Sequence, residues 1–287
     1  MEITAELVKT LRDRTDAGMM DCKRALKETG GDMEEAVAYL RQKGLAVAGK
    51  RAGRATSEGQ VWAHIAADHH SGVLLEVNCE TDFVAKTPSF VDFGANLAEC
   101  LAGVALETVE EFLTHPAPRM PELKVGDYLN DVIAKTGEAI RIRQFTRYAG
   151  DGVVAAYIHH GGKIGVLLEL TGAQAAPEAL AAAKDLAMQV AATNPLAVAR
   201  EQVAPEEVAK EKAIYQAQAL ESGKPENIVE RMVVGRLDKF YKEVCLLEQA
   251  FVKNPDITAT QFLKEVGQKL GGKSLTVRRF TRYQIGT

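Results

Sequence analysis

Cysteine is scarce in this sequence, and the four that occur are widely scattered. Cys22, Cys79, Cys100 and Cys245 form no C-x-x-C pair, so the sequence predicts neither a disulfide framework nor a zinc knuckle. Reduced thiols are typical of cytosolic proteins, and we expect this chain to be cytoplasmic.

Long apolar runs and a large excess of one charge are also missing. No apolar stretch approaches membrane-spanning length, and the start Met1-Glu2-Ile3-Thr4 has no basic and apolar leader, so we expect no membrane contact and no export. The formal net charge of −4 provides no general attraction to nucleic acid. A chain of 287 residues that is 46% hydrophobic has room for about two compact units.

The first part of the chain predicts a small helical bundle. Thr4 and Asp32 have the flanking residues of helix N-caps, and Gly30-Gly31 and Gly44 are typical helix ends. These signals define three helices, the third of which is expected to end at Gly44. Because such a bundle is too small for an enzyme core, we assign residues 1–55 to an N-terminal bundle followed by a linker.

Two features of this part bear on function. Met19 and Met20 open the second helix, where methionines suit either a core or an adaptable contact surface. The segment Lys50-Arg51-Ala52-Gly53-Arg54 is typical of a mobile basic linker. A weak nucleic-acid contact through these charges is the less favoured interpretation.

The rest of the chain contains an internal duplication. Val61–Glu76 aligns without a gap on Val154–Glu169, and both segments predict two strands joined by a turn. Each hairpin is followed by a proline and a helix, and Arg143–Tyr148 and Arg278–Tyr283 are matching last strands. The repetition predicts an α+β fold of two related subdomains, each a three-stranded antiparallel sheet with helices on one face.

The two copies differ directly after their hairpins. The first carries Thr81-Asp82-Phe83-Val84 between a strand and a helix, where the second has only Gly172-Ala173-Gln174-Ala175. A requirement of the scaffold should appear in both copies, and loops on a rigid scaffold often carry function. This tip is therefore a candidate contact site. The alternative is that Phe83 folds back into the core while Asp82 starts a turn.

The second copy also contains an insertion of charged helical sequence. Pro205 opens one helix, and an apolar stripe from Ile228 to Phe240 defines another. Ser222-Gly223-Lys224-Pro225 predicts a tight turn between them, so we expect an antiparallel coiled-coil hairpin that projects as a contact arm.

The expected organisation has four parts. They are the bundle with its linker (1–55), the first core subdomain (56–150), the second core subdomain (151–193 and 256–287) and the inserted hairpin (194–255).

The segment Gly267–Ser274 matches the phosphate-binding pattern G-x-x-x-x-G-K-[ST] letter for letter. That site requires a strand before it and a helix after it, whose N-terminal amides hold the phosphates. Here a helical pattern precedes the motif and an alternating strand pattern follows it. We interpret it as a helix C-cap and turn, with an ATPase as the less favoured alternative.

Histidines and carboxylates make no stronger case for an enzyme. Adjacent strand residues point to opposite faces, so His69-His70 and His159-His160 are expected to be exposed turn residues and not metal ligands. Glu76 and Glu169 recur in both copies, which indicates a shared structural part and not an acid–base pair. We expect no catalytic residue, no metal and no cofactor.

Three motifs resemble the bacterial elongation factor Ts family, the nucleotide exchange factors of the GTPase elongation factor Tu. Thr10–Thr15 with Ala17–Lys23 is similar to the N-terminal signature of that family, and Glu76–Ala85 is similar to its second signature. Ser222–Pro225 resembles the tip of its coiled-coil hairpin. The similarity runs over nearly the whole chain in the same order.

The resemblance implies a ubiquitin-associated-like bundle, a duplicated core and a coiled-coil arm. It also implies that the tip enters the G domain of the GTPase and disturbs its magnesium site, with Asp82 and Phe83 intruding and Thr81 and Val84 shaping the loop. The second subdomain would hold another domain of the GTPase. Three bundle residues would dock on the G domain: Arg12, Met19 and Met20.

The implied role is translation elongation, through exchange of GDP for GTP on the partner and without direct nucleic-acid contact; a higher-order assembly with the GTPase stays open. A binding-only adaptor that holds a protein through the arm and bundle is the alternative. The sequence stops at Thr287, directly after its last strand, whereas some relatives continue into a further helix that adds contacts to the partner, so the resemblance leaves any function of that helix open here.

Overall fold

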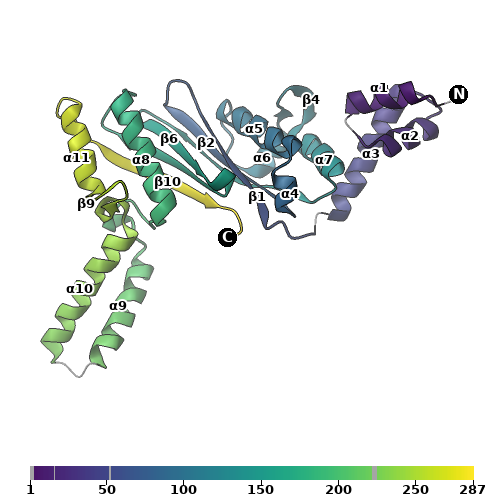
Figure 1. Cartoon of the computed structure of the whole chain (residues 1–287). Helices are drawn as coiled ribbons and strands as arrows, with labels where there is room; N and C mark the ends of the chain where they lie inside the picture. Colours follow the sequence, from purple (N-terminus) through teal and green to yellow (C-terminus); the bar gives the residue numbers. More distant parts are fainter. Residues whose placement is uncertain (1–2, 16, 52, 222–224) are drawn as a thin grey trace.

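The computed structural model describes residues 3–15, 17–51, 53–221 and 225–287. Figure 1 shows a helical bundle at the N-terminal end, a central pair of sheets with their helices, and a helical arm that projects from the other end. The strands of both sheets pair in antiparallel fashion, which confirms the α+β class. Within the described ranges, no helix is both long and apolar enough to cross a membrane.

The N-terminal bundle contains the three expected helices, α1 (Ala5–Thr15), α2 (Met19–Glu28) and α3 (Met33–Arg51). The prediction that Gly44 ends the third helix is wrong, because α3 continues through it and also includes Lys50 and Arg51 of the supposed linker. Gly44 lies where α3 packs on α7, and a Cβ there would be 3.3 Å from the Cβ of Ala134. The glycine therefore allows a close helix contact and does not stop the helix.

Each core subdomain combines a three-stranded sheet, a two-stranded ribbon and covering helices. The first contains β1 (Glu58–Ile65), β2 (Ser71–Cys79), α4 (Asp82–Ala85), α5 (Pro88–Ala102), α6 (Val109–Thr114), β3 (Pro116–Ala117), β4 (Met120–Lys124), α7 (Val125–Thr136) and β5 (Ile140–Ala149). The second contains β6 (Val153–His159), β7 (Ile164–Thr171), α8 (Pro177–Thr193), β8 (Ala250–Phe251), β9 (Asn254–Thr258), α11 (Ala259–Lys269) and β10 (Thr276–Gln284).

The sheets show the duplication directly. Their strand orders are β1-β2-β5 and β6-β7-β10, so the second strand of each hairpin is central in both. The hairpin registers also match, since Trp62 faces Leu75 in the first copy and Ala155 faces Leu168 in the second. The ribbons β3–β4 and β8–β9 are a further matching pair, which the sequence did not reveal because strands of two to five residues give almost no periodic signal.

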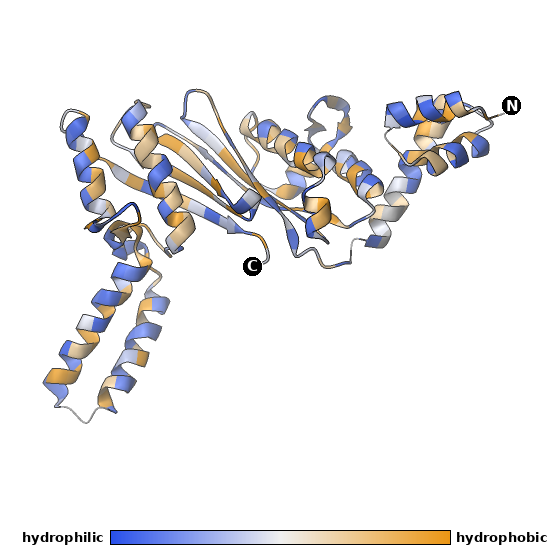
Figure 2. Ribbon diagram, in the orientation of Figure 1, coloured by the Kyte–Doolittle hydropathy of each residue, from blue (hydrophilic) through white to orange (hydrophobic). Residues whose placement is uncertain are grey.

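The arm consists of α9 (Pro205–Leu220) and α10 (Glu226–Val244), which pack through residues such as Tyr215, Val229 and Val233. Figure 2 shows hydrophilic positions along most of both helices, as expected for a pair that projects from the body. The predicted turn lies outside the described residues at 222–224. The four predicted part boundaries stay predictions, and residue 255 falls inside β9.

The glutamates that recur in both copies are buried at equivalent positions. Glu169 accepts hydrogen bonds from Arg278 (2.9 Å) and Arg279 (2.7 Å), and Glu76 accepts one from Gln144 (2.7 Å). Each last strand has a register shift beside its glutamate, at Arg278 in β10 and at the equivalent arginine in β5. A β-bulge redirects a side chain, so the repeated glutamate and bulge form one structural unit in each copy.

Helices cover one face of each sheet, and the other faces pack against each other. The hydroxyls of Thr146 and Tyr283 lie 2.6 Å apart, and those of their counterparts Thr281 and Tyr148 lie 2.7 Å apart. Equivalent residues of the two copies therefore exchange the same hydrogen bond. Such reciprocal contacts are the mark of a two-fold relation between the copies.

Two equivalent glycines bring these faces together. A Cβ on Gly165 would lie 2.4 Å from Cγ1 of Val61, and a Cβ on Gly72 would lie 3.0 Å from Cγ1 of Val154. Val61 and Val154 are themselves equivalent and buried. The distance between the sheets thus depends on the absence of a methyl group at both positions.

Substituting Gly165→Ala should lower the free energy of unfolding by about 1–3 kcal/mol, because the new methyl group overpacks the contact between the sheets. Gly235→Ala is the matched control: Gly235 is an exposed position in α10 with open space around its missing Cβ. That change should be neutral or stabilise by up to about 1 kcal/mol through helix propensity. Urea unfolding measures both, and equal stability of the two variants would contradict the proposed close approach.

Candidate functional site

The candidate site is the tip that joins β2 to α5. Thr81 is the N-cap of the four-residue helix α4, and its hydroxyl accepts a hydrogen bond from the amide of Val84 at 3.4 Å. Thr87 then caps α5, which has Pro88 in its first turn. The chain therefore makes two capped turns in succession, and the short helix stands at the end of the sheet as a separate feature.

Phe83 is 80% exposed, more than any other large hydrophobic side chain among the described residues. The alternative that it folds back into the core is wrong, although Asp82 does start a helical turn as that alternative held. Ala85 is buried, and Val84 packs on the core of the first subdomain. One side of α4 is thus anchored while its aromatic side chain points into solvent.

Asp82 presents a negative charge beside this aromatic ring. Lys86 donates a hydrogen bond to Oδ2 of Asp82 at 2.6 Å, which holds the pKa of Asp82 below its usual value and raises the pKa of Lys86. The Asp82 side chain is 45% exposed, so this ion pair is screened by water and contributes little to stability. A partner with a competing cation can replace Lys86 at low cost.

Two residues that the sequence analysis did not single out form hydrogen bonds with the backbone and side chains of the tip. The side-chain amide of Gln60 donates to the carbonyl of Ala85 at 2.6 Å. Glu138, which precedes β5, accepts from the Thr81 hydroxyl at 2.6 Å and from the Thr81 amide at 3.0 Å. These bonds fix the backbone on both sides of Asp82 and Phe83.

The other predicted contact residues lie apart from the tip. Arg12 is on α1 and Met19 and Met20 open α2, in the bundle at the N-terminal end (Figure 1). Both methionines are exposed, Met19 by 59% and Met20 by 70%, so they are not core residues. The exposed apolar side chains among the predicted contact residues therefore lie in two separate places, on the tip and on the bundle.

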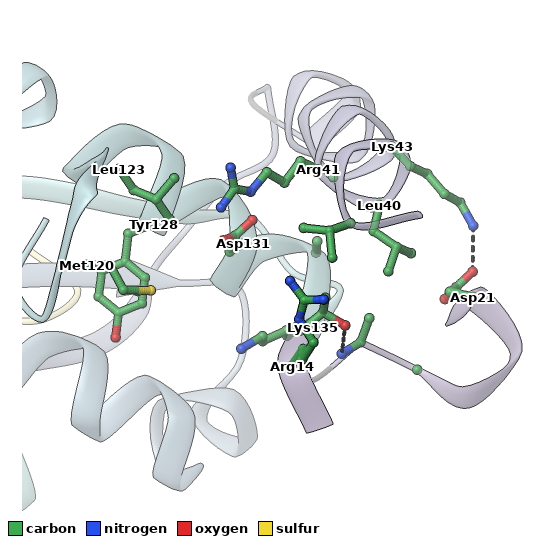
Figure 3. A pocket seen from close by; sticks show the side chains of 16 residues that line it. Arg14, Asp21, Leu40, Arg41, Lys43, Met120, Leu123, Tyr128, Asp131 and Lys135 are labelled. Carbon is green, nitrogen blue, oxygen red and sulfur yellow. Dashed lines mark hydrogen bonds and ion pairs between the residues drawn. The ribbon is translucent and has the colours of Figure 1, made fainter. Parts of the chain in front are cut away.

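A cavity of about 340 Å³ separates the bundle from the core. Figure 3 shows Leu40 and Arg41 of α3 on one side and Tyr128 and Asp131 of α7 on the other. Burial raises the pKa of Asp131, against the attraction of Arg41 and Lys135. The lining mixes charged and apolar side chains, and the cavity lies beside the close contact of Gly44 with Ala134 that joins α3 to α7.

The motifs for other chemistries have structural explanations. The Gly267–Ser274 segment begins in the last turn of α11 and ends before β10, and the amides of Gly272 and Lys273 donate to the carbonyl of Gly267 at 3.0 and 2.9 Å. These amides are therefore used within the turn and cannot hold a phosphate. The part of the chain that the structure describes contains no cluster of His, Cys, Asp and Glu able to hold a metal.

The expectation of exposed histidines is correct for one pair and wrong for the other. His159 and His160 are exposed at the β6–β7 turn. His69 and His70 are half-buried and contact the second copy: the His69 carbonyl accepts a hydrogen bond from the amide of Val154 (2.7 Å), and Nδ1 of His70 lies 3.0 Å from the carbonyl oxygen of Gly152. The first hairpin turn is thus part of the contact between the copies.

Removing the ring of Phe83 should leave stability almost unchanged, because the ring is in solvent in the folded chain. Phe83→Ala should shift the free energy of unfolding by less than about 0.5 kcal/mol, as for an ordinary surface change. Phe90→Ala, which removes a fully buried ring, should cost about 3–5 kcal/mol. Denaturant unfolding of both variants measures this, and a large loss for Phe83→Ala would mean that the ring packs in solution.

Asp131→Asn should stabilise the chain near neutral pH. A carboxyl group whose folded pKa is raised binds its proton more tightly in the folded chain, so its ionisation costs stability as the pH rises through that pKa. The variant should therefore have the higher unfolding midpoint at about pH 7, and the difference should shrink on acidification towards the usual carboxyl pKa. Thermal unfolding at several pH values measures it; a less stable variant at neutral pH contradicts the raised pKa.

Comparison with known proteins identifies the family to which the chain belongs. The family model described as elongation factor TS matches residues 80–287. An elongation factor Ts of Clostridium botulinum (strain Eklund 17B / Type B) is 48% identical over 285 residues, which cover 99% of this chain and 93% of the relative. One of Clostridium perfringens (strain SM101 / Type A) is 47% identical with the same coverage. As the motifs predicted, the chain belongs to the elongation factor Ts family of translation elongation factors.

Proposed function

We propose that this chain is a guanine nucleotide exchange factor for the GTPase elongation factor Tu. The observation that carries the proposal is the exposed Phe83 ring on a tip whose backbone is held by hydrogen bonds to Thr81. Burying a phenylalanine side chain stabilises by roughly 1.5–3 kcal/mol, which this chain alone does not gain. A partner that accepts the ring gains that free energy on binding.

The proposed mechanism needs no covalent chemistry and no cofactor of this chain. Phe83 enters between elements of the G domain and shifts the packing that holds Mg²⁺ and the β-phosphate. Asp82 attracts groups that orient the magnesium waters. Mg²⁺ is the largest local positive charge beside the diphosphate, so its displacement weakens GDP binding.

Thermodynamic linkage relates the affinity of the factor for the GTPase to the affinity of the nucleotide for the same GTPase. The factor binds the nucleotide-free GTPase better than the nucleotide-bound form, so nucleotide must weaken the factor by the same ratio. Each 1.4 kcal/mol of this difference changes the affinity about tenfold. GTP then refills the site and releases the factor.

We assign the remaining surfaces to docking. Arg12, Met19 and Met20 place the ubiquitin-associated-like bundle on the G domain, and the second core subdomain holds another domain of the GTPase. The inserted arm adds contacts at the opposite end of the molecule. The proposed site of action is the cytoplasm, where translation takes place.

Release of fluorescent GDP from elongation factor Tu at fixed free Mg²⁺ tests the proposal. The wild-type chain should accelerate release strongly, and Phe83→Ala or Asp82→Ala should abolish most of the acceleration. Binding to the nucleotide-free GTPase should weaken less than exchange does, because the bundle and the second subdomain still dock.

Two results would contradict the proposal. Binding without faster release would favour an adaptor that uses the tip as an anchor. Equal losses of binding and exchange in the Phe83→Ala variant would reject the role of the ring as a wedge.

A further inference from the structure

Two carboxylates hold the base of the tip, by joining the segment that follows β2 to the segment that precedes β5. Glu80, at the end of β2, accepts a hydrogen bond from the amide of Ala139 at 2.7 Å. Glu138, beside Ala139, accepts from the hydroxyl and the amide of Thr81 at 2.6 and 3.0 Å. Each segment thus supplies a carboxylate to the backbone of the other. We call these four contacting residues, Glu80, Thr81, Glu138 and Ala139, the brace.

The brace is charge-assisted, which makes its bonds stronger than neutral ones. The amide of Ala139 and the guanidinium of Arg54 hold the pKa of Glu80 below its usual value, so this carboxylate is ionised at neutral pH. A hydroxyl has one proton and two acceptor sites. Thr81 uses its proton for Glu138 and an acceptor site for the amide of Val84. Glu138 therefore orients the group that caps α4.

The duplicated fold provides an internal comparison. Extending the gapless alignments of the copies places Ala173 opposite Glu80 and Lys273 opposite Glu138. The strand pairing is the same in both places: Asn78 pairs with Arg141 just as Thr171 pairs with Thr276. Two equivalent glycines before these residues, Gly137 and Gly272, both have positive φ, at 75° and 82°.

The second copy thus builds the same strand pairing at this end of its sheet with neither carboxylate. It also has no tip. The brace is therefore not a requirement of the fold, and it occurs only where the chain carries Thr81–Val84. A four-residue helix does not hold its own shape, because helix formation needs a costly nucleus, so an external support has a clear purpose here.

We propose that Glu138, assisted by Glu80, is a positioning residue that fixes α4 so that Phe83 meets the partner already oriented. This inference rests on the proposed exchange function. Without the brace the tip must be ordered during docking, and that ordering cost falls on the step in which the ring enters the GTPase. Glu138 acts through Phe83 and touches no nucleotide or metal.

The first measurement concerns this chain alone. In Glu138→Ala, the Thr81 amide loses its acceptor, and the Val84 amide keeps only a Thr81 hydroxyl that Glu138 no longer orients. Amide hydrogen exchange at both residues should therefore accelerate at least about tenfold, which corresponds to about 1.4 kcal/mol of local opening. Lys273→Ala is the matched control at the exposed equivalent position, and it should leave the tip unchanged. Unchanged protection in Glu138→Ala would overturn the proposal.

The second measurement is GDP release from the GTPase with a double-variant cycle. Glu138→Ala should slow exchange by about three- to tenfold, Glu138→Gln by less because it keeps one acceptor, and Lys273→Ala not at all. Since Glu138 acts through the ring, Glu138→Ala should add almost nothing in a chain that already carries Phe83→Ala. A residue with a purely structural role would add its full effect there.

The outcomes distinguish a failure of the exchange function from a failure of the positioning role of Glu138. A wild-type chain that fails to accelerate GDP release rejects the exchange function, and with it the positioning role. Normal wild-type exchange with a loosened tip but full activity in Glu138→Ala overturns the positioning role alone. Additive effects of Glu138→Ala and Phe83→Ala overturn it as well.

Discussion

The contact between the two sheets constrains most of this molecule, because equivalent residues of the two copies must meet across it. Thr146 bonds Tyr283 as Thr281 bonds Tyr148, and each copy supplies a glycine to the valine of the other. With one face of each sheet used in this way, helices can cover only the opposite face. The bundle and the arm must then attach at the ends of the core, where Figure 1 shows them. The loops that join strand to helix are left at the surface, and the tip is one of them.

Symmetry of the scaffold makes its asymmetries informative. Both copies keep the buried glutamate, the bulge beside it and the positive-φ glycine before the last strand, so these belong to the fold. The tip and the brace occur in the first copy, and the arm occurs in the second. A duplicated chain thus separates what folding requires from what was added to one copy. The additions are the parts to which we assign contact with a partner.

Much of the fold could be predicted from the sequence because its signals are local and repeated. The gapless hairpin alignment and the matching last strands determined the sheets, and the glycine and proline positions determined most helix ends. Gly44 was misread because a glycine also serves close packing, and only the tertiary contact with Ala134 distinguishes the two uses. His69 and His70 were misread for a related reason, since they contact Val154 and Gly152 of the other copy. At the candidate site, Thr81–Val84 could be found from its presence in one copy alone. Glu138 could not be found from its own segment, because its hydrogen bonds to Thr81, 57 residues earlier in the chain, form only when β2 pairs with β5.

The tip must satisfy two demands that oppose each other. A ring that is to enter a partner has to stay out of its own core, and an exposed ring on a short segment is normally mobile. The chain resolves this by burying Ala85, packing Val84 and bracing Thr81, so that the backbone around Phe83 is held while the ring gains nothing from folding. On the proposed function, docking through the distant bundle and second subdomain supplies affinity that does not depend on the ring. Binding free energy from remote contacts can then be used for distortion at the reacting centre. The free energy of inserting Phe83 is thereby available to displace the metal, and it need not hold the complex together.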